Sequence, residues 1–196
     1  MTPDEVMKEF EDAGALLKGH FVLSSGLHSD TYLNKSIVAT DAARAERLCR
    51  ALADKARAAV GDIDYVVAPA MGAIVYGYET SRHLRAPFFF VERVDGAFQL
   101  RRGFELPTGA RVLIVEDIVS TGLSARECVT CVNALGAEVL AVACLIDRSG
   151  GAADIGAPLL PLASINVAAY PADDLPPELA AIPAVKPGSR GVSQSA

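Results

Sequence analysis

Apolar residues recur along the chain with two spacings, which together predict an alternation of strands and helices. Short runs of aliphatic and β-branched residues are typical of strands buried on both faces of a parallel sheet. Such runs lie at residues 64–68, 88–91, 111–115, 138–146 and 164–168. Stripes with a helical period follow Asp41, extend from about residue 74 to Leu84, and follow Gly122. We therefore expect an α/β fold with a doubly wound, mainly parallel sheet.

The first 40 residues, 1–40, precede this repeating pattern, and we expect them to form a small N-terminal hood beside the sheet. Thr2 is suited to cap a first helix, whose apolar stripe continues to Leu17 with an interruption at Gly14. Residues 19–34 then alternate like two short strands joined by a Ser/Gly turn, which places His20 and His28 on the surface or in loops.

The whole chain, residues 1–196, is expected to be a single domain, because no linker is long enough to separate two. Pro177 is suited to start a short helix near the C-terminus. The residues from about 184 to 196 are expected to be a flexible tail.

The run at 111–115 leads into the most polar strand end of the chain. Two adjacent acids, three hydroxyl residues and a glycine follow it before the next helix: Glu116, Asp117, Ser120, Thr121, Gly122 and Ser124. The N–H groups of a glycine-bearing turn and a helix start can bind an anion, and hydroxyls add donors. The acids would repel that anion, but they can accept hydrogen bonds from a ribose diol or help hold a metal. Because ligands bind at this edge of open α/β sheets, the order of residues predicts a site for a phosphorylated sugar.

Two common nucleotide-binding motifs do not occur at this strand end. It has neither G-x-x-x-x-G-K-[ST] nor G-x-G-x-x-G, so it is not a nucleoside-triphosphate P-loop. An ordinary strand-to-helix turn with solvated acids is the simplest alternative. The coincidence of two acids, three hydroxyls and a glycine favours the sugar-phosphate site.

Composition and charge narrow the choice of partners. The net charge of −6 argues against general binding to nucleic acid or anionic membranes, and no apolar run approaches the length of a membrane span. The four cysteines lie within apolar patterns, so we expect reduced thiols in a cytoplasmic protein. Cys128-x-x-Cys131 reads as a core pair rather than a metal or redox site. An acidic protein that binds a polyanion needs local positive charge or a divalent cation.

Residues 112–124, V-L-I-V-E-D-I-V-S-T-G-L-S, resemble the phosphoribosyl-pyrophosphate (PRPP) signature of the type I phosphoribosyltransferases. The resemblance implies that the two acids meet the ribose hydroxyls and that residues 118–124 bind the 5′-phosphate. It also makes the turn after 64–68 a pyrophosphate loop, for which we predict a non-proline cis peptide at Ala70–Met71. The residues implied for PRPP are Ala70, Met71, Gly72, Arg93, Glu116, Asp117, Ile118, Val119, Ser120, Thr121, Gly122, Leu123 and Ser124.

A second stretch, residues 21–34, resembles the hood of the orotate phosphoribosyltransferases, which helps to form the base pocket. The match is carried by Phe21, Leu23, Ser25, Gly26, Ser29, Tyr32 and Asn34. Ser24 stands where many bacterial members have Lys. The residues implied for orotate are Ser25, Tyr32, Ser120 and Arg148. In this family an Arg in the place of Arg148 pairs with the carboxylate of the base, a contact that would reject uracil; packing inside the hood is an equal alternative for Tyr32.

Residues 92–104 read as a hairpin, because an Asp-Gly pair between alternating apolar residues favours a type I′ turn. In the family this region is the mobile loop that closes over the reaction, often from the partner subunit of a homodimer. Many bacterial relatives have Lys and His there, whereas the cations here are Arg93, Arg101 and Arg102. We predict catalytic roles for Asp117, which would stabilise positive charge that develops on the ribose ring, and for Arg101 and Arg102, which would stabilise the leaving group rather than donate a proton. The alternative is that these arginines only make the hairpin soluble.

The resemblance predicts transfer of the 5-phosphoribosyl group from PRPP to orotate, giving orotidine 5′-monophosphate and pyrophosphate. Its small-molecule substrates would be PRPP and orotate, and Mg²⁺ would be held mainly through PRPP rather than by protein ligands. One alternative is a phosphoribosyltransferase for another nucleobase, which should lack the hood pattern and have no need for Arg148. Another is a non-catalytic PRPP-sensing regulator, which should carry a DNA-binding element; no helix-turn-helix pattern is visible in the sequence.

Overall fold

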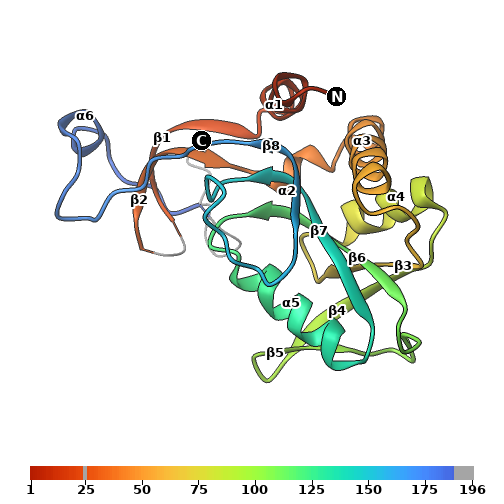
Figure 1. Cartoon of the computed structure of the whole chain (residues 1–196). Helices are drawn as coiled ribbons and strands as arrows, with labels where there is room; N and C mark the ends of the chain where they lie inside the picture. Colours follow the sequence, from red (N-terminus) through yellow and green to blue (C-terminus); the bar gives the residue numbers. More distant parts are fainter. Residues whose placement is uncertain (24–25, 188–196) are drawn as a thin grey trace.

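The computed structural model describes residues 1–23 and 26–187, which form a central sheet flanked by helices (Figure 1). The sheet has six strands in the order β5-β4-β3-β6-β7-β8, in which only β5 is antiparallel to its neighbour. These strands are β3 (Tyr65–Pro69), β4 (Phe88–Val94), β5 (Ala97–Leu100), β6 (Arg111–Val119), β7 (Glu138–Asp147) and β8 (Leu159–Ser164). The predicted α/β class with a mainly parallel, doubly wound sheet is confirmed.

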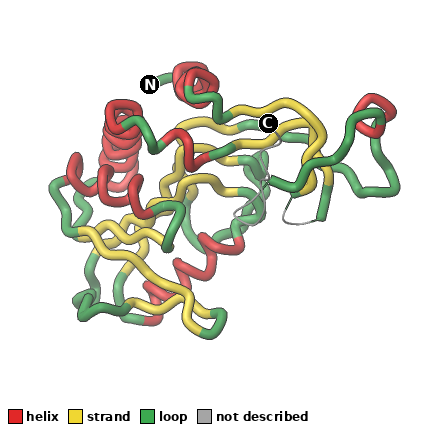
Figure 2. Tube along the Cα trace, turned by 180° about the vertical axis from the view of Figure 1, so that it is seen from behind, coloured by secondary structure: helices red, strands yellow, loops and turns green. Residues whose placement is uncertain are grey.

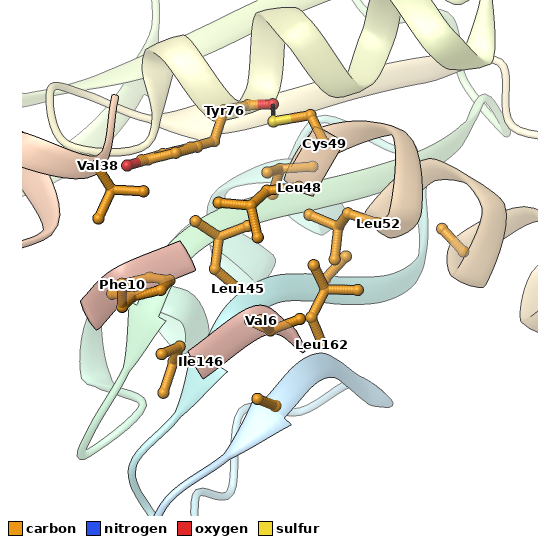
Figure 3. Close-up of a cluster of buried hydrophobic side chains, with 14 of the residues drawn as sticks. Val6, Phe10, Val38, Leu48, Cys49, Leu52, Tyr76, Leu145, Ile146 and Leu162 are labelled. Atoms are coloured by element: carbon orange, nitrogen blue, oxygen red, sulfur yellow. Dashed lines mark hydrogen bonds between the residues drawn. The ribbon is translucent and has the colours of Figure 1, made fainter. Parts of the chain in front are cut away.

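Successive side chains of β6 pack on opposite faces of the sheet, which explains the unbroken apolar run. Val112 and Ile114 belong to a cluster with α5 (Leu123–Ala134). Leu113 and Val115 belong to the other cluster, which α1 (Pro3–Asp12), α3 (Ala42–Val60) and α4 (Ile74–Leu84) also form. Figure 3 shows this second cluster, whose members include Phe10, Leu48, Leu52, Tyr76 and Leu145. Both faces of the sheet are therefore closed by helices, and its strand ends carry the polar residues.

The predicted helix starts fit the observed caps. The side chain of Thr2 accepts a hydrogen bond from the Glu5 N–H in a capping box. Asp41 accepts from the Ala43 and Arg44 N–H groups at the start of α3. The hairpin turn between β4 and β5 has positive φ at both Asp95 (50°) and Gly96 (85°), as a type I′ turn requires.

The hood consists of β1 (Leu16–Val22) and β2 (His28–Leu33), which pair antiparallel, followed by α2 (Lys35–Val38). Figures 1 and 2 show it at one end of the molecule, with α6 (Pro177–Ala180) beyond it and away from α3 and α4. The predicted stripe to Leu17 is wrong: the helix ends at Asp12, since Gly14 takes a φ of 64°, and the chain then continues as a strand.

A C-terminal segment, residues 168–185, completes the hood, which the sequence prediction limited to residues 1–40. The Val22 N–H donates to the Val185 carbonyl, and the Val185 N–H donates to the His20 carbonyl, each at 2.8 Å. Val185 is thus held by β1, contrary to the expected tail from about 184, whereas residues 188–196 lie outside the described residues. His20 was expected on the surface or in a loop but is buried within β1, with its Nδ1 2.7 Å from the Ile182 carbonyl.

Two strand predictions also need correction. The predicted strand at 164–168 is wrong, because the strand there is β8, which ends at Ser164. Pro161 argues against a central strand, but β8 is an edge strand, where a residue without an N–H is tolerated. The run at 111–115 continues to Val119, so both acids lie inside β6 rather than after it.

Candidate functional site

The site is built where β6 extends beyond its neighbour β3. On one side β6 stays paired with β7 as far as Val119, opposite Asp147. On the other side its pairing with β3 stops at Ile114, opposite Val67. The last residues of β6 are therefore hydrogen-bonded to β7 on one side and unpaired with β3 on the other, where the turn after β3 approaches.

The two acids of β6 are buried and point to opposite faces of the sheet, as successive strand residues do. Glu116 is 6 % exposed, and its Oε1 accepts a 2.9 Å hydrogen bond from the Ser124 hydroxyl on α5. Asp117 is 1 % exposed and forms an ion pair with Lys35 of α2, whose Nζ lies 2.7 Å from Oδ2 and 2.9 Å from Oδ1. Each acid is thus held by a different element, α5 for one and the hood for the other.

Burial, together with the neighbouring charge of Asp117, raises the pKa of Glu116 to about 7, against the lowering effect of the Ser124 hydroxyl. Glu116 therefore changes charge near neutral pH. A carboxyl group with a pKa near neutrality can accept a hydrogen bond from a sugar hydroxyl when ionised and donate one when protonated.

The turn after β6 forms a small hollow of about 140 Å³, lined by Glu116 and residues 118–125. Gly122 takes a φ of 79°, and a Cβ there would come within 2.8 Å of Ile155 and 3.0 Å of Ala153. This glycine is the N-cap of α5 and provides no side-chain cap, and the first residues of the helix line the hollow, where the Leu123 N–H donates to the Thr121 hydroxyl at 3.4 Å. Ser120 and Thr121 are exposed at its rim. The hollow has the size and donors for a phosphate group.

The turn after β3 carries the predicted cis peptide, which the structure confirms at Ala70–Met71. The Ala70 N–H donates to the Val91 carbonyl of β4 at 2.8 Å, which ties the turn to the neighbouring strand. A Cβ added at Gly72 would lie 2.4 Å from Asp117 Oδ2 and 3.3 Å from Lys35 Nζ. The predicted pyrophosphate loop therefore touches the acid at the end of β6, and a side chain at Gly72 would not fit.

Sequence reasoning missed Lys35. Its side chain is 45 % exposed, and its backbone carbonyl accepts a 2.9 Å hydrogen bond from the buried Tyr76 hydroxyl of α4. Lys35 and Asp117 are 82 residues apart, and no local pattern connects a short hood helix with a distant strand. The only available signal was a lone lysine directly after the hood motif.

Arg148 follows β7, and its N–H donates to the Val119 carbonyl at 2.7 Å, so it lies beside the end of β6. Among the described residues its buried Nε has no hydrogen-bond partner. Burial lowers the pKa of Arg148, whereas the electrostatic effect of Tyr32 in the hood raises it. A half-buried guanidinium with an open donor is a site for an anionic group.

The loop that carries Arg148 is ordered by its neighbour Asp147, which is buried. Oδ1 of Asp147 accepts from the Ser149 N–H and hydroxyl at 2.7 and 2.6 Å, and Oδ2 accepts from the Gly151 N–H at 3.1 Å. Tyr32 also packs against Phe21, with ring centroids 5.6 Å apart. Ser25, the remaining predicted orotate residue, lies outside the described residues.

The structure does not bring the hairpin arginines to the other predicted residues. Arg93 forms an ion pair with Glu127 of α5 and lies over the Phe98 ring. Arg102 forms a bidentate pair with Glu92 at 2.8 and 2.9 Å. Arg101 follows Leu100, which pairs with Val91. Because β5 is antiparallel to β4, the chain at Arg101 runs away from the C-terminal end of β4.

Three further observations concern metals, thiols and membranes. Within residues 1–23 and 26–187, no group of three or more His, Cys, Asp and Glu side chains is arranged to hold a metal ion. All four cysteines are free, and Cys128 is buried in the core, as predicted. No helix in the described part of the chain is both long and apolar enough to cross a membrane.

Residues 39–169 match the family described as the phosphoribosyl transferase domain. The chain is 58 % identical over 190 residues to an orotate phosphoribosyltransferase of Caulobacter vibrioides, covering 97 % of this chain and 98 % of the relative. It is 60 % identical over 193 residues to an orotate phosphoribosyltransferase of Methylorubrum populi, with 98 % of each chain covered.

Among solved structures, the orotate phosphoribosyltransferase of Aeropyrum pernix superposes with a TM-score of 0.72. The match covers 82 % of this chain and 93 % of the other, at 24 % sequence identity. At this identity the likeness shows a shared fold.

Proposed function

Because the chain belongs to the orotate phosphoribosyltransferases, we infer that it transfers the 5-phosphoribosyl group from PRPP to orotate. The products are orotidine 5′-monophosphate and pyrophosphate, in the biosynthesis of pyrimidines. N1 of orotate forms a bond to C1′ of the ribose as the bond from C1′ to the pyrophosphate oxygen breaks, and the N1 proton is released. The observation that carries this assignment is the full-length identity of about three residues in five to these enzymes.

We propose that the hollow after β6 binds the 5′-phosphate through residues 118–124. The open N-terminus of α5 and the exposed hydroxyls of Ser120 and Thr121 supply hydrogen-bond donors there. Glu116 and Asp117 accept hydrogen bonds from the ribose diol, which lies between the phosphate hollow and the pyrophosphate loop. Ala70, Met71 and Gly72 form that loop, which the close approach of Gly72 to Asp117 supports.

The base pocket in this proposal lies between Arg148, Tyr32 and Ser120. The free Nε of Arg148 supports it, because a half-buried guanidinium with an unpartnered Nε is stabilised by the carboxylate of orotate. Adenine, hypoxanthine and uracil carry no carboxylate and would leave the guanidinium unpaired.

Catalysis in this proposal consists of positioning and charge stabilisation. The transition state has positive charge on the ribose ring, and Asp117, buried beside the ring, stabilises that charge. Arg101 and Arg102 stabilise the departing pyrophosphate, and Arg93 contributes to PRPP binding. Arg101 and Arg102 reach the pyrophosphate of a neighbouring subunit, because in their own chain the segment that carries them runs back along β4.

We propose Mg²⁺ as the cofactor, entering with PRPP and bound through its phosphate oxygens. A divalent cation fits this site because the protein is acidic overall, with a net charge of −6, while the substrate is a polyanion. When bound, it would neutralise charge on the leaving group. Asp117 is the carboxylate beside the pyrophosphate loop that could contact its hydration shell.

We propose a cytoplasmic homodimer that shares its active-site loop and binds neither nucleic acid nor membranes. The absence of a disulfide among the four cysteines, all of which lie in the described part of the chain, supports the compartment. The dimer is supported by an apolar stripe next to the pyrophosphate loop, in which Met71, Val75 and Tyr78 are 82, 49 and 56 % exposed.

The test is pyrophosphate release from PRPP by the purified protein. Release should require both orotate and Mg²⁺, and chelation of the metal should abolish it. Orotate should be consumed in the presence of equal adenine, hypoxanthine or uracil. Consumption of one of those bases in preference to orotate would favour a phosphoribosyltransferase for another base, and no release with any base would refute the catalytic assignment.

A further inference from the structure

Lys35 lies where the proposed pyrophosphate loop, Asp117 and the hood meet. The roles proposed above for the loop and for the two acids assign no function to this lysine. Three elements converge on its side chain. Asp117 of β6 binds the ammonium at 2.7 and 2.9 Å, and the backbone at Gly72 is close enough that a Cβ would lie 3.3 Å from Nζ. Tyr76 holds its backbone carbonyl.

The simplest role for Lys35 is to neutralise a buried carboxylate. That role needs only a contact with Asp117, and a buried cation would serve it best, because screening by water weakens an exposed pair. The Lys35 side chain is instead 45 % exposed, while that of Asp117 is 2 % exposed. An ammonium has three N–H donors, and the two oxygens of Asp117 leave donor capacity on its open side.

The ion pair of Lys35 and Asp117 adjoins Gly72, which belongs to the proposed pyrophosphate loop. Two arginines of the hairpin, Arg102 and Arg93, are paired elsewhere in their own chain, with Glu92 and with Glu127. The region beside Gly72 and Asp117 thus contains one lysine and no hairpin arginine of the same subunit, as far as the described residues show.

We propose that Lys35 binds the pyrophosphate group of PRPP and stabilises the oxygen that leaves C1′, while Asp117 on its other side contacts the ribose. This inference rests on the proposed function and adds a substrate contact to it. Lys35 keeps its proton throughout, since the electron pair of the breaking C1′–oxygen bond goes to pyrophosphate and the ammonium acts by charge alone.

The proposal separates two ligands that share parts of the site. Pyrophosphate with Mg²⁺ occupies only the leaving-group side, whereas orotidine 5′-monophosphate carries the ribose and the 5′-phosphate but no pyrophosphate. Replacing Lys35 should therefore weaken the first ligand much more than the second. A residue that acts only through Asp117 should do the opposite, because Asp117 contacts the ribose.

The experiment measures both dissociation constants by calorimetry for wild type, Lys35→Met, Lys35→Gln and Lys35→Arg. Loss of one charge-assisted contact should raise the dissociation constant of Mg²⁺-pyrophosphate about tenfold in the Met and Gln variants, with kcat lowered at least as much. Lys35→Gln keeps a donor for Asp117 and so tests the charge alone. Lys35→Arg should restore both values to within about threefold of wild type.

The matched control is Lys18→Met, which removes a lysine of β1 that pairs with Asp30 and is 68 % exposed. It should leave both constants unchanged. A double variant gives a further readout. Adding Lys35→Met to the Asp117→Asn variant should lower pyrophosphate affinity as much as it does in wild type.

Two outcomes would overturn the proposal. One is unchanged pyrophosphate binding in Lys35→Gln, and the other is a loss in Lys35→Met that vanishes in the Asp117→Asn background. If the proposed function itself were wrong, wild type would not bind orotidine 5′-monophosphate, whatever its affinity for pyrophosphate. That result differs from either outcome for Lys35.

Discussion

The end of β6 and the β4–β5 hairpin both carry charged residues, but the charged residues differ in burial and in pairing. Glu116 and Asp117 are buried, and nearby Arg148 has a buried Nε without a partner among the described residues. The hairpin arginines are exposed, and Arg93 and Arg102 each pair with an acid of the same chain. Family resemblance points to both regions, whereas the physical environment singles out the first.

The difference shows which kind of charge indicates a site. Burying a charge costs several kcal/mol unless a partner compensates, so an incompletely paired buried charge requires another explanation, such as a ligand. An exposed ion pair contributes about 0–1 kcal/mol to stability and forms easily on any surface. The buried group should therefore be far more sensitive to substitution than the hairpin.

The strongest test of this contrast is Arg148→Met. Removing the guanidinium should lower kcat/KM for orotate about a thousandfold, because the substrate carboxylate would lose a charged partner. PRPP binding should change less than twofold. The matched control is Arg126→Met on α5, whose exposed arginine contacts Asp154; equal losses in both variants would remove Arg148 from the base pocket.

Gly72→Ala should have the next largest effect. Its backbone φ is not in the left-handed region, so the change adds only a methyl group, which would come within 2.4 Å of Asp117 Oδ2. The displaced carboxylate should lower kcat/KM for PRPP about a hundredfold, since small misplacements at a reacting centre have effects of this size. Steady-state kinetics gives the loss, and thermal unfolding checks the fold. Activity close to wild type would mean that the pyrophosphate loop and Asp117 do not act together.

The hairpin is tested by the double variant Arg101→Ala/Arg102→Ala, for which we expect kcat about tenfold lower. Mixing it with Arg148→Met should restore about a quarter of wild-type activity if the arginines act on the neighbouring subunit. Random pairing gives half mixed dimers, and each of these has one intact site. No recovery on mixing, measured after subunit exchange, would place the arginines in their own chain's site or outside catalysis.

The smallest expected effect concerns the stability of the fold near Glu116. The pKa of this group is about 7 in the folded protein, above its ordinary value of 4.5, so the folded state holds a proton that the unfolded state has lost between these values. Stability therefore falls as pH rises through this window, and Glu116→Gln should remove that fall. At pH 8 its Tm should exceed that of wild type by about 3 °C or more, and near pH 4.5 the two should converge.

The control for this measurement is Glu138→Gln, because Glu138 is exposed at the start of β7. It should follow wild type at every pH. Parallel curves of Tm against pH for wild type and Glu116→Gln would mean that Glu116 ionises normally in the folded protein.

The sequence could predict the parts of this structure that depend on near neighbours. The buried strands, the caps at Thr2 and Asp41 and the Asp95-Gly96 turn follow from local patterns. The cis peptide at Ala70–Met71 followed from the resemblance alone. β8 was misplaced because a proline in an apolar run excludes only a central strand, and the run itself does not show which strand is at the edge.

The contacts that the sequence could not predict are long-range. The pairing of Lys35 with Asp117 depends on how the hood lies against the sheet, which no periodicity encodes. The burial of His20 depends likewise on a segment near the other end of the chain. The residue types of the candidate site were therefore predictable, whereas the residues that hold them in place were not.

The hydrogen bonds between the strands of the hood and residues 168–185 have a consequence for the order of folding. His20 and Ile182, which meet in the structure, are separated by 162 positions in the chain. A ribosome releases the first strands of the hood long before the segment that completes them, so the hood cannot be completed until Ile182 has been synthesised. The hood is thus completed after the strands of the central sheet, all of which precede that segment in the chain.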